Sequence, residues 1–216
     1  MSKEKVIETA LGEVGKTENP PGSNMTEYGE RYGWNGVPWC VQFLWDCFNR
    51  GGERAAFFGG AKTASCGTLM QWYKEQGQLV PIEEATGGDI GFFAFNGGKV
   101  PEHCGLITEG RPDYVMTVEG NTTASSGNGN ESNGGCVAEK LRGSRYLVGV
   151  ARPKYKEEPA LADKKPDYAG HWAIASIIKA MDKGVMKGYP DGSFRPNDTP
   201  TRAELAVILD RLGLLD

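Results

Sequence analysis

Cys40 is the residue of this sequence best placed to act as a nucleophile. It lies in the segment GWNGVPWCVQFLWDCF (33–48), in which apolar residues recur at helical spacing after Pro38. Because proline is tolerated in the first turn of a helix, we expect the helix to begin near Pro38, with Cys40 in that turn. Unpaired backbone N–H groups and the helix dipole favour the thiolate there, and the thiolate is the nucleophilic form. The alternative is an ordinary buried thiol, because free cysteine is among the most buried residue types.

His103 is one of two histidines in the chain, and a predicted hairpin sets it opposite a carboxylate. The segments 103–108 and 114–119 have the pattern of antiparallel strands. If the turn is centred on residues 111–112, His103 pairs with Glu119, with Cβ atoms about 5 Å apart. Such a carboxylate orients the imidazole and supports its charged form, which completes a nucleophile, base and orienter. The alternative is a surface His–Glu pair, and a register shift of one residue would separate the two side chains.

A zinc site is the competing interpretation of the same residues. Cys40, Cys104, Cys136 and His103 are ligand types that zinc prefers. However, Cys104 follows His103 directly in a predicted strand, so we expect their side chains on opposite faces. The segment before Cys40 lacks the clustered oxygen ligands that calcium needs. We therefore predict no metal site and no cofactor.

Charge and composition limit the classes of function. A net charge of −4 over 216 residues excludes a chain built to bind nucleic acid. The five cysteines include no CxxC pair, which argues against a disulfide framework and favours a reducing compartment. No stretch approaches the roughly 20 apolar residues that span a bilayer, and the first residues lack the apolar run of a signal peptide. We expect synthesis in the cytoplasm without a signal peptide, and no membrane insertion.

The order of the predicted elements indicates an α+β domain, with helices first and antiparallel strands after them. We expect a surface loop at 19–33 and a mobile Gly/Asn/Ser loop at 127–135. The domain covers residues 1–153, a charged linker covers 154–166, and a small all-α unit covers 167–216. The predicted helices and strands are 6–14, 38–50 and 64–76, and 88–95, 103–108, 114–119 and 146–152.

The segments YGERYGWNGVPWCVQFLWDCF, GDIGFFAF, EHCGLI and VEGNT, in this order, resemble a CHAP domain over residues 1–153. This is the cysteine- and histidine-dependent amidohydrolase/peptidase family of papain-like fold. The resemblance implies that Cys40 is the nucleophile, His103 the general base, and Glu119 and Asn121 the orienting polar pair. It also implies cleavage of amide bonds in bacterial peptidoglycan, and we expect Trp39, beside the nucleophile, to contact the substrate.

The C-terminal unit is predicted to contain two helices. The second begins with a capping box, formed by Thr201 and Glu204. Arg202, in the first turn, could bind an anion through its guanidinium and the free N–H groups, and the alternative is a solvated charge. The predicted buried stripe of this helix is Leu205, Ile208, Leu209 and Leu212.

The segments HWA, GYPDGSFRP and TRAE resemble an S-layer homology (SLH) repeat. That family binds acidic secondary cell-wall polysaccharides, and the resemblance gives Arg202 a role in gripping the glycan. His171 and Trp172 are expected to brace the first helix of the unit. Such repeats usually occur in threes, and one is present here, so we predict a homotrimer through this unit. The alternative is a monomer in which residues 212–215 fold back over the exposed flank.

Together these patterns predict a modular peptidoglycan hydrolase of the phage endolysin type. It would be made in the bacterial host cytoplasm and act at the cell wall. Its partners would be peptidoglycan and the wall polysaccharide. We expect an N-acetylmuramoyl-L-alanine amidase. The alternatives are a cross-bridge or stem-peptide endopeptidase, and a non-catalytic wall-attachment protein.

Overall fold

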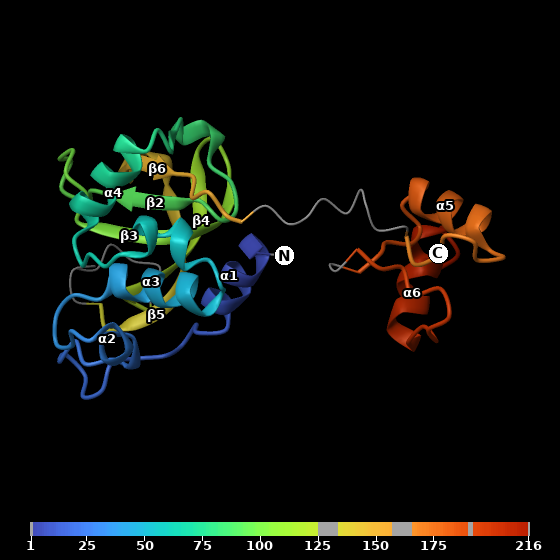
Figure 1. The fold of residues 1–216 in the computed structure, drawn as a ribbon, viewed down its shortest axis with the longest axis horizontal. Coiled ribbons are helices and arrows are strands. Elements are labelled where there is room, and N and C mark those ends of the chain that lie inside the picture. The colour runs from blue at the N-terminus through green and yellow to red at the C-terminus, as the bar shows by residue number, and fades with distance from the viewer. Residues whose placement is uncertain (1, 125–133, 157–165, 190–191, 216) are drawn as a thin grey trace. The chain divides into compact units, whose positions relative to one another are not determined.

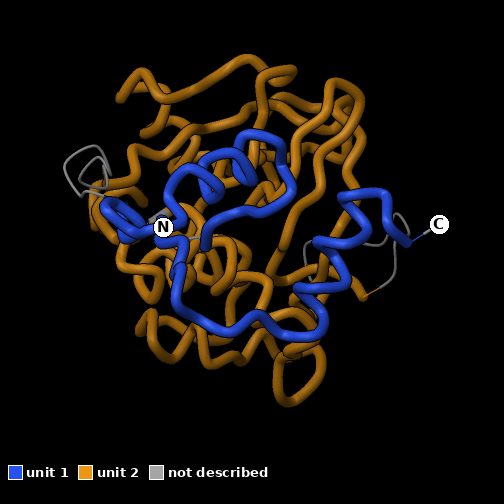
Figure 2. Tube along the Cα trace, turned by 90° about the vertical axis from the view of Figure 1, so that its right-hand side faces the viewer, with its two compact units in different colours: residues 1, 157–216 blue, residues 2–156 orange. Residues whose placement is uncertain are grey.

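The chain forms two units, residues 2–156 and 157–216, which are coloured separately in Figure 2. The division falls three residues beyond the predicted end of the first domain. Most of the predicted loop 127–135 and linker 154–166 lies outside the described residues. The computed structural model describes residues 2–124, 134–156, 166–189 and 192–215. No helix within these ranges is both long enough and apolar enough to cross a membrane.

A six-stranded antiparallel sheet is the framework of the first unit (Figure 1). The strand order is β1-β6-β2-β3-β4-β5, so the strand that begins at His103 lies inside the sheet. Helices precede the sheet in the chain, and this mixture confirms the predicted α+β class. The strands are β1 (Leu79–Val80), β2 (Ile90–Phe93), β3 (His103–Gly110), β4 (Tyr114–Thr122), β5 (Cys136–Gly143) and β6 (Leu147–Ala151).

The main core lies where α3 packs on β3 and β4. Every residue of α3 from Cys40 to Phe48 is buried, because apolar side chains face the sheet and the polar Gln42 and Asp46 find partners. A smaller apolar cluster that includes Phe93 and Ile107 is built from other residues of the same strands. The helices of this unit are α1 (Ser2–Leu11), α2 (Glu27–Tyr32), α3 (Cys40–Arg50) and α4 (Cys66–Glu75).

The β3–β4 hairpin has a register two residues away from the predicted one. Leu106 pairs with Val118, and the register shifts within residues 107–109. Continued along β3, this pairing places His103 two residues from the position opposite Glu119, so the predicted direct pair is wrong. The irregularity adds a residue to one strand, which the sequence does not reveal. Because side chains alternate with a period of two, the shift leaves both residues on the same face.

Helix α2 corrects the prediction that residues 19–33 form only a surface loop. The Thr26 hydroxyl accepts a hydrogen bond from the Gly29 N–H, and Gly33 ends the helix in a left-handed conformation. Tyr28 and Tyr32, one helical turn apart, are both buried. Aromatic residues one helical turn apart favour a short helix. The many turn formers around them led instead to the prediction of a loop.

Strand β5 is absent from the sequence-based prediction because its alternation is reversed. Leu141 is 64% exposed, whereas Lys140 and Arg142 are buried. A pattern search expects apolar residues to face the core, so a strand that turns charged residues inward is overlooked. The reversal shows that the face beneath β5 holds a polar network.

The C-terminal unit contains the helices α5 (Ile174–Asp182) and α6 (Arg202–Arg211) among its described residues. The predicted capping box is present: the Glu204 N–H donates to the Thr201 hydroxyl at 3.2 Å, and the Thr201 N–H donates to the Glu204 carboxylate at 2.7 Å. Ile177 is the one apolar residue that is buried in the described part of this unit. The predicted buried stripe of α6 is therefore wrong in part, because Leu205 and Leu212 are each 50% exposed.

Candidate functional site

Cys40 is the first residue of α3, because the helix begins two residues later than the start predicted near Pro38. Gly120 in β4 allows this end of the helix to approach the sheet closely. A Cβ atom at Gly120 would lie 2.5 Å from the Cβ of Phe43 and 2.8 Å from the ring of Trp39. A residue with a side chain would push α3 away, so Gly120 fixes the position of the Cys40 backbone over β4.

His103 and Glu119 form a direct contact in the interior. The imidazole Nε2 lies 2.9 Å from the Glu119 Oε2, and the two side chains are 1% and 0% exposed. Gly105 leaves the space that the Glu119 side chain occupies, since a Cβ there would lie 2.5 Å from the Glu119 Cγ. The predicted contact is therefore confirmed, although it crosses the hairpin diagonally.

Arg142 in β5 is a member of this network that the sequence did not point to. Its Nε and Nη2 atoms donate to the two carboxylate oxygens of Glu119, and the Thr117 hydroxyl donates to the same carboxylate at 2.6 Å. The Arg142 guanidinium lies 4.8 Å from the centre of the Phe95 ring. This bidentate pair holds the Glu119 carboxylate in the orientation in which it contacts His103.

Pairing outweighs burial in setting the charges of this network. Burial alone would raise the pKa of Glu119, but hydrogen bonds from Arg142 and the charge of His103 lower it to about 2. Burial alone would lower the pKa of His103, but the charge of Glu119 and the contact with Cys40 raise it to about 10. Hydrogen bonds from two neighbouring thiols, reinforced by His103, lower the pKa of Cys40 well below its usual range despite its burial. These pKa shifts favour the charged forms of both Cys40 and His103, and the His103 Nδ1 atom is buried without a hydrogen-bond partner.

The two thiols beside Cys40 belong to Cys66 and Cys104. The Sγ atoms of Cys40 and Cys66 are 3.6 Å apart, and the three sulfur atoms all lie within 4.8 Å of one another. Cys136 is not part of this group, because its thiol donates to the Thr122 carbonyl at 3.0 Å. The group of thiols therefore differs from the zinc set considered from the sequence.

Asn121 and Trp39, two further residues singled out from the sequence, are both buried. Asn121 is buried at an irregularity in the β4–β5 pairing, with φ of 55°, a conformation that asparagine tolerates better than most residues. Trp39 is fully buried and stacks on Tyr28 with ring centres 5.4 Å apart. Contrary to the expectation, Trp39 turns into the core and offers no surface to a substrate.

This arrangement is suited to nucleophilic acyl transfer. In such a reaction Cys40 would be the nucleophile, His103 would give a proton to the leaving group, and Glu119 would stabilise the imidazolium. Cys40 is 5% exposed, so little of this residue meets solvent.

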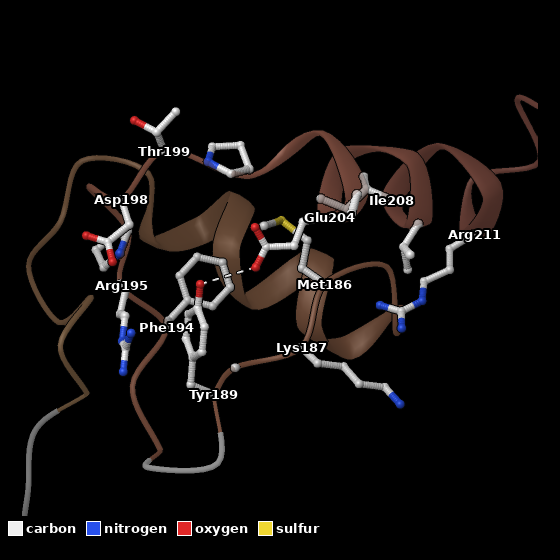
Figure 3. Close-up of a pocket in the computed structure, with 15 residues that line it drawn as sticks. Met186, Lys187, Tyr189, Phe194, Arg195, Asp198, Thr199, Glu204, Ile208 and Arg211 are labelled. Carbon is white, nitrogen blue, oxygen red and sulfur yellow. Dashed lines mark hydrogen bonds between the residues drawn. The ribbon is translucent and has the colours of Figure 1, made fainter.

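A second candidate site is a cavity of about 580 Å³ in the C-terminal unit, lined by residues of α6 and of the segments 186–189 and 194–200. Figure 3 shows the cationic side chains of Lys187, Arg195 and Arg211 among its lining residues, together with Asp198 and Glu204. The Arg195 guanidinium lies 4.1 Å from the centre of the Tyr189 ring. An aromatic ring beside cations suits a sugar that carries negative charge.

Arg202 and the HWA segment lie apart from this cavity lining. Arg202 is the exposed first residue of α6 and is not among the residues that line the cavity. His171 braces the unit as expected, through contacts with the Asn197 side chain and the Ala173 N–H, both at 3.2 Å. Trp172 does not brace it, because its side chain is 90% exposed.

The C-terminal unit matches a known family. The model of the S-layer homology domain matches residues 166–206, so the chain carries an SLH domain there. The N-terminal unit, with Cys40 and His103, lies outside the matched residues.

The similar proteins are long surface proteins. Cell surface glycoprotein 1 of Acetivibrio thermocellus is 49% identical over 128 residues, which is 59% of this chain and 5% of that protein. Outer membrane protein SlpA of Deinococcus radiodurans is 48% identical over 54 residues, 25% of this chain and 4% of that protein. The cellulosome-anchoring protein of Acetivibrio thermocellus is 44% identical over 45 residues, 21% of this chain and 10% of that protein. The chain thus spans at most a tenth of the length of these relatives, and its SLH domain associates it with the cell surface and wall.

Proposed function

We propose that this chain is a wall-attached cysteine hydrolase that cleaves amide bonds of peptidoglycan. The observation that carries the proposal is a buried network of four side chains. Arg142 pairs with Glu119, Glu119 contacts His103, and His103 interacts with Cys40. A buried bidentate Arg–Glu pair is costly to assemble, and here its geometry orients an imidazole next to a thiol at a helix start. A non-catalytic attachment domain gains nothing from this placement.

The reaction would proceed through an acyl-enzyme. The Cys40 thiolate attacks the amide carbonyl carbon, and the backbone N–H of Cys40, at the start of α3, faces the developing oxyanion. The carbon–nitrogen bond breaks as His103 gives its proton to the leaving amine. Water then attacks the thioester, and His103 takes the proton from this water, which restores the thiolate and the imidazolium.

The substrate class follows from the attachment domain and from the likeness of the N-terminal unit to CHAP domains. SLH domains bind the wall polysaccharide, so the catalytic domain would act where peptidoglycan is abundant. We favour an N-acetylmuramoyl-L-alanine amidase of endolysin type over a cross-bridge or stem-peptide endopeptidase. Origin from a phage stays a prediction from the sequence.

Mass spectrometry of fragments released from purified peptidoglycan tests this function. An amidase releases intact stem peptides with a free L-alanine amino terminus, and an endopeptidase exposes amino groups within the stem or cross-bridge. Cys40→Ala protein is the control for contaminating hydrolases. Absence of any new amino group after digestion with reduced, metal-free protein would refute the hydrolase.

Attachment to the wall without catalysis is the second candidate function. The SLH domain and the relatives named for the cell surface and for anchoring support it more directly than they support hydrolysis. Walls stripped of their secondary polysaccharide provide the test: the chain should sediment with intact walls and stay in solution with stripped ones. Sedimentation without release of fragments would favour attachment alone.

A homotrimer through the SLH unit also belongs to this proposal. Trp172, Leu205 and Val207 are 90%, 50% and 46% exposed, although they are large apolar residues. Leu214 and Leu215 are 65% and 56% exposed, so they do not fold back over the flank as the monomer alternative requires. Light scattering after size exclusion should give three times the chain mass, and residues 1–156 alone should give a monomer.

A further inference from the structure

The group of Cys40, Cys66 and Cys104 is drawn from three separate elements. Cys40 is the first residue of α3, Cys66 is the first residue of α4, and Cys104 is the second residue of β3. All three cysteines are free, and their exposed fractions are 5%, 7% and 0%. The fold therefore brings three thiols from different parts of the chain together. A redox-active disulfide would need only two of them.

The separations between the sulfur atoms match those of a tetrahedral metal site. A zinc–sulfur bond of about 2.3 Å gives sulfur atoms that are about 3.8 Å apart at the corners of a tetrahedron. The observed Cys40–Cys66 separation is 3.6 Å, and no pair in the group exceeds 4.8 Å. Side-chain rotations that move a sulfur by about 1 Å are enough to bring all three to this geometry.

The charge of such a site must be stabilised by its surroundings. Three thiolates and one divalent ion carry a net charge of −1, which a buried site must stabilise. The N-terminal ends of α3 and α4 both lie at the group, because Cys40 and Cys66 are their first residues. Each helix is at least ten residues long, and the positive ends of both dipoles act on the sulfur atoms.

We propose that Cys40, Cys66 and Cys104 form a binding site for one thiophilic metal ion in tetrahedral coordination. Zn²⁺ is the physiological ion with which the site is tested. His103 is not a ligand in this arrangement, because the group of mutually close donor atoms contains the three thiols alone. The fourth position is left to a solvent molecule. The inference stands on the sulfur geometry and does not depend on hydrolase activity. If the hydrolase proposal also holds, the ion binds the nucleophilic Cys40 sulfur and therefore inhibits hydrolysis.

Cobalt substitution provides the direct test on the full chain. Reduced, chelator-treated protein is titrated with Co²⁺, and the sulfur-to-cobalt charge-transfer absorption is recorded. One equivalent should saturate the band, and one equivalent of Zn²⁺ should abolish it. Cys66→Ala should weaken binding at least about tenfold, because even the loss of a group that only supports a ligand costs about 10- to 100-fold. Cys136→Ala, which removes a buried thiol outside the group, should bind as the wild type does.

Two outcomes would overturn the proposal: no charge-transfer band in the wild-type protein, or equal weakening by Cys136→Ala and Cys66→Ala. Circular dichroism checks that each variant folds. If Cys66→Ala is unfolded, alkylation of wild-type protein decides instead: Zn²⁺ should protect Cys40 and Cys66 from iodoacetamide, and unchanged labelling would refute the site. Because neither readout uses peptidoglycan, failure of the metal site and failure of the hydrolase are separate results.

Discussion

The two units of the chain differ in how completely they bury their side chains. The first unit encloses its reactive groups, and His103 and Glu119 are 1% and 0% exposed within a sheet covered by helices. The second unit buries one apolar residue, Ile177, in its described part and leaves Trp172 90% exposed. The contrast indicates that the first unit closes its own core, whereas the described part of the second leaves large apolar side chains exposed.

Removal of the nucleophile is expected to have the largest effect. Cys40→Ala should lower peptidoglycan hydrolysis by more than about a thousandfold, because no other group forms the acyl-enzyme. Wall binding should persist, since the SLH unit is a separate unit. Dye release from labelled walls measures the first effect and sedimentation measures the second. Residual hydrolysis within a few-fold of the wild type would end the assignment of Cys40.

The second prediction concerns the diagonal contact under His103. Glu119→Gln keeps the shape of the side chain but removes the charge that supports the imidazolium, and we expect a loss of about 100-fold in kcat. Arg142 then lacks its anionic partner, so the melting temperature should also fall. Thr117→Val is the matched control, because it removes the hydroxyl contacts to Glu119 and to the Lys140 carbonyl but leaves the carboxylate charged. Full activity of Glu119→Gln would show that the carboxylate is not part of the mechanism.

Separation of the units should cost binding and leave folding intact. Residues 1–156 should melt cooperatively and hydrolyse soluble peptidoglycan at the full rate, because their core is closed. Sedimentation with whole walls should decrease by about tenfold or more, since attachment raises the local concentration of enzyme. A truncated protein that sediments as well as the full chain would place the wall-binding surface in the first unit.

A smaller effect tests where the SLH unit holds its ligand. Lys187→Ala removes a cation from the cavity lining and should weaken wall binding about three- to tenfold, as loss of one charged contact does. Arg202→Ala should change it less than about twofold, because Arg202 lies outside that lining. Lys183→Ala, an exposed cation outside the cavity lining, is the control. The reverse ranking of the first two variants would restore the role predicted for Arg202.

The smallest effect is on acid stability of the first unit. Burial would raise the pKa of Glu13, but hydrogen bonds from Lys16, Arg50 and Tyr28 lower it to about 2. Since the folded pKa lies below the unfolded value, this stabilisation is full above about pH 4.5 and is lost as the pH falls towards 2. It amounts to about 1–2 kcal/mol once solvent screening at Lys16 and Arg50 is allowed for.

Urea unfolding at pH 7 and pH 3 measures this contribution. The wild-type protein should lose more unfolding free energy between the two values than Glu13→Gln does. Equal losses in the two proteins would assign acid sensitivity to other carboxylates, such as Glu119.

The sequence predicted the helix of Cys40 and the contact of His103 with Glu119 for reasons of local chemistry. Pro38 and the apolar spacing mark the helix, and a period of two makes the contact tolerant of the two-residue error in register. The irregularity in β3 itself could not be predicted, because a bulge depends on the pairing of two strands and not on either strand alone.

Arg142 and Cys66 were missed because long-range contacts bring them to the site. Arg142 lies 23 residues from Glu119 in the chain, and Cys66 lies 26 residues from Cys40. Their own neighbourhoods gave no signal, apart from the inward-facing charges of β5. The expected roles of Trp39 and Trp172 failed in opposite directions for a related reason: amino-acid type alone does not reveal whether an aromatic side chain turns inward or outward.

The last residues of the first unit pack against the C-terminal end of α3. Tyr155 stacks on Phe48 with ring centres 5.6 Å apart, and the Lys156 N–H donates to the Glu53 carboxylate at 2.9 Å. These contacts lie at the C-terminal end of α3, about 15 Å along the helix from Cys40 at its start. A pull on the chain beyond residue 156 would therefore load the C-terminal end of α3, whereas Cys40 lies at the other end of the same helix.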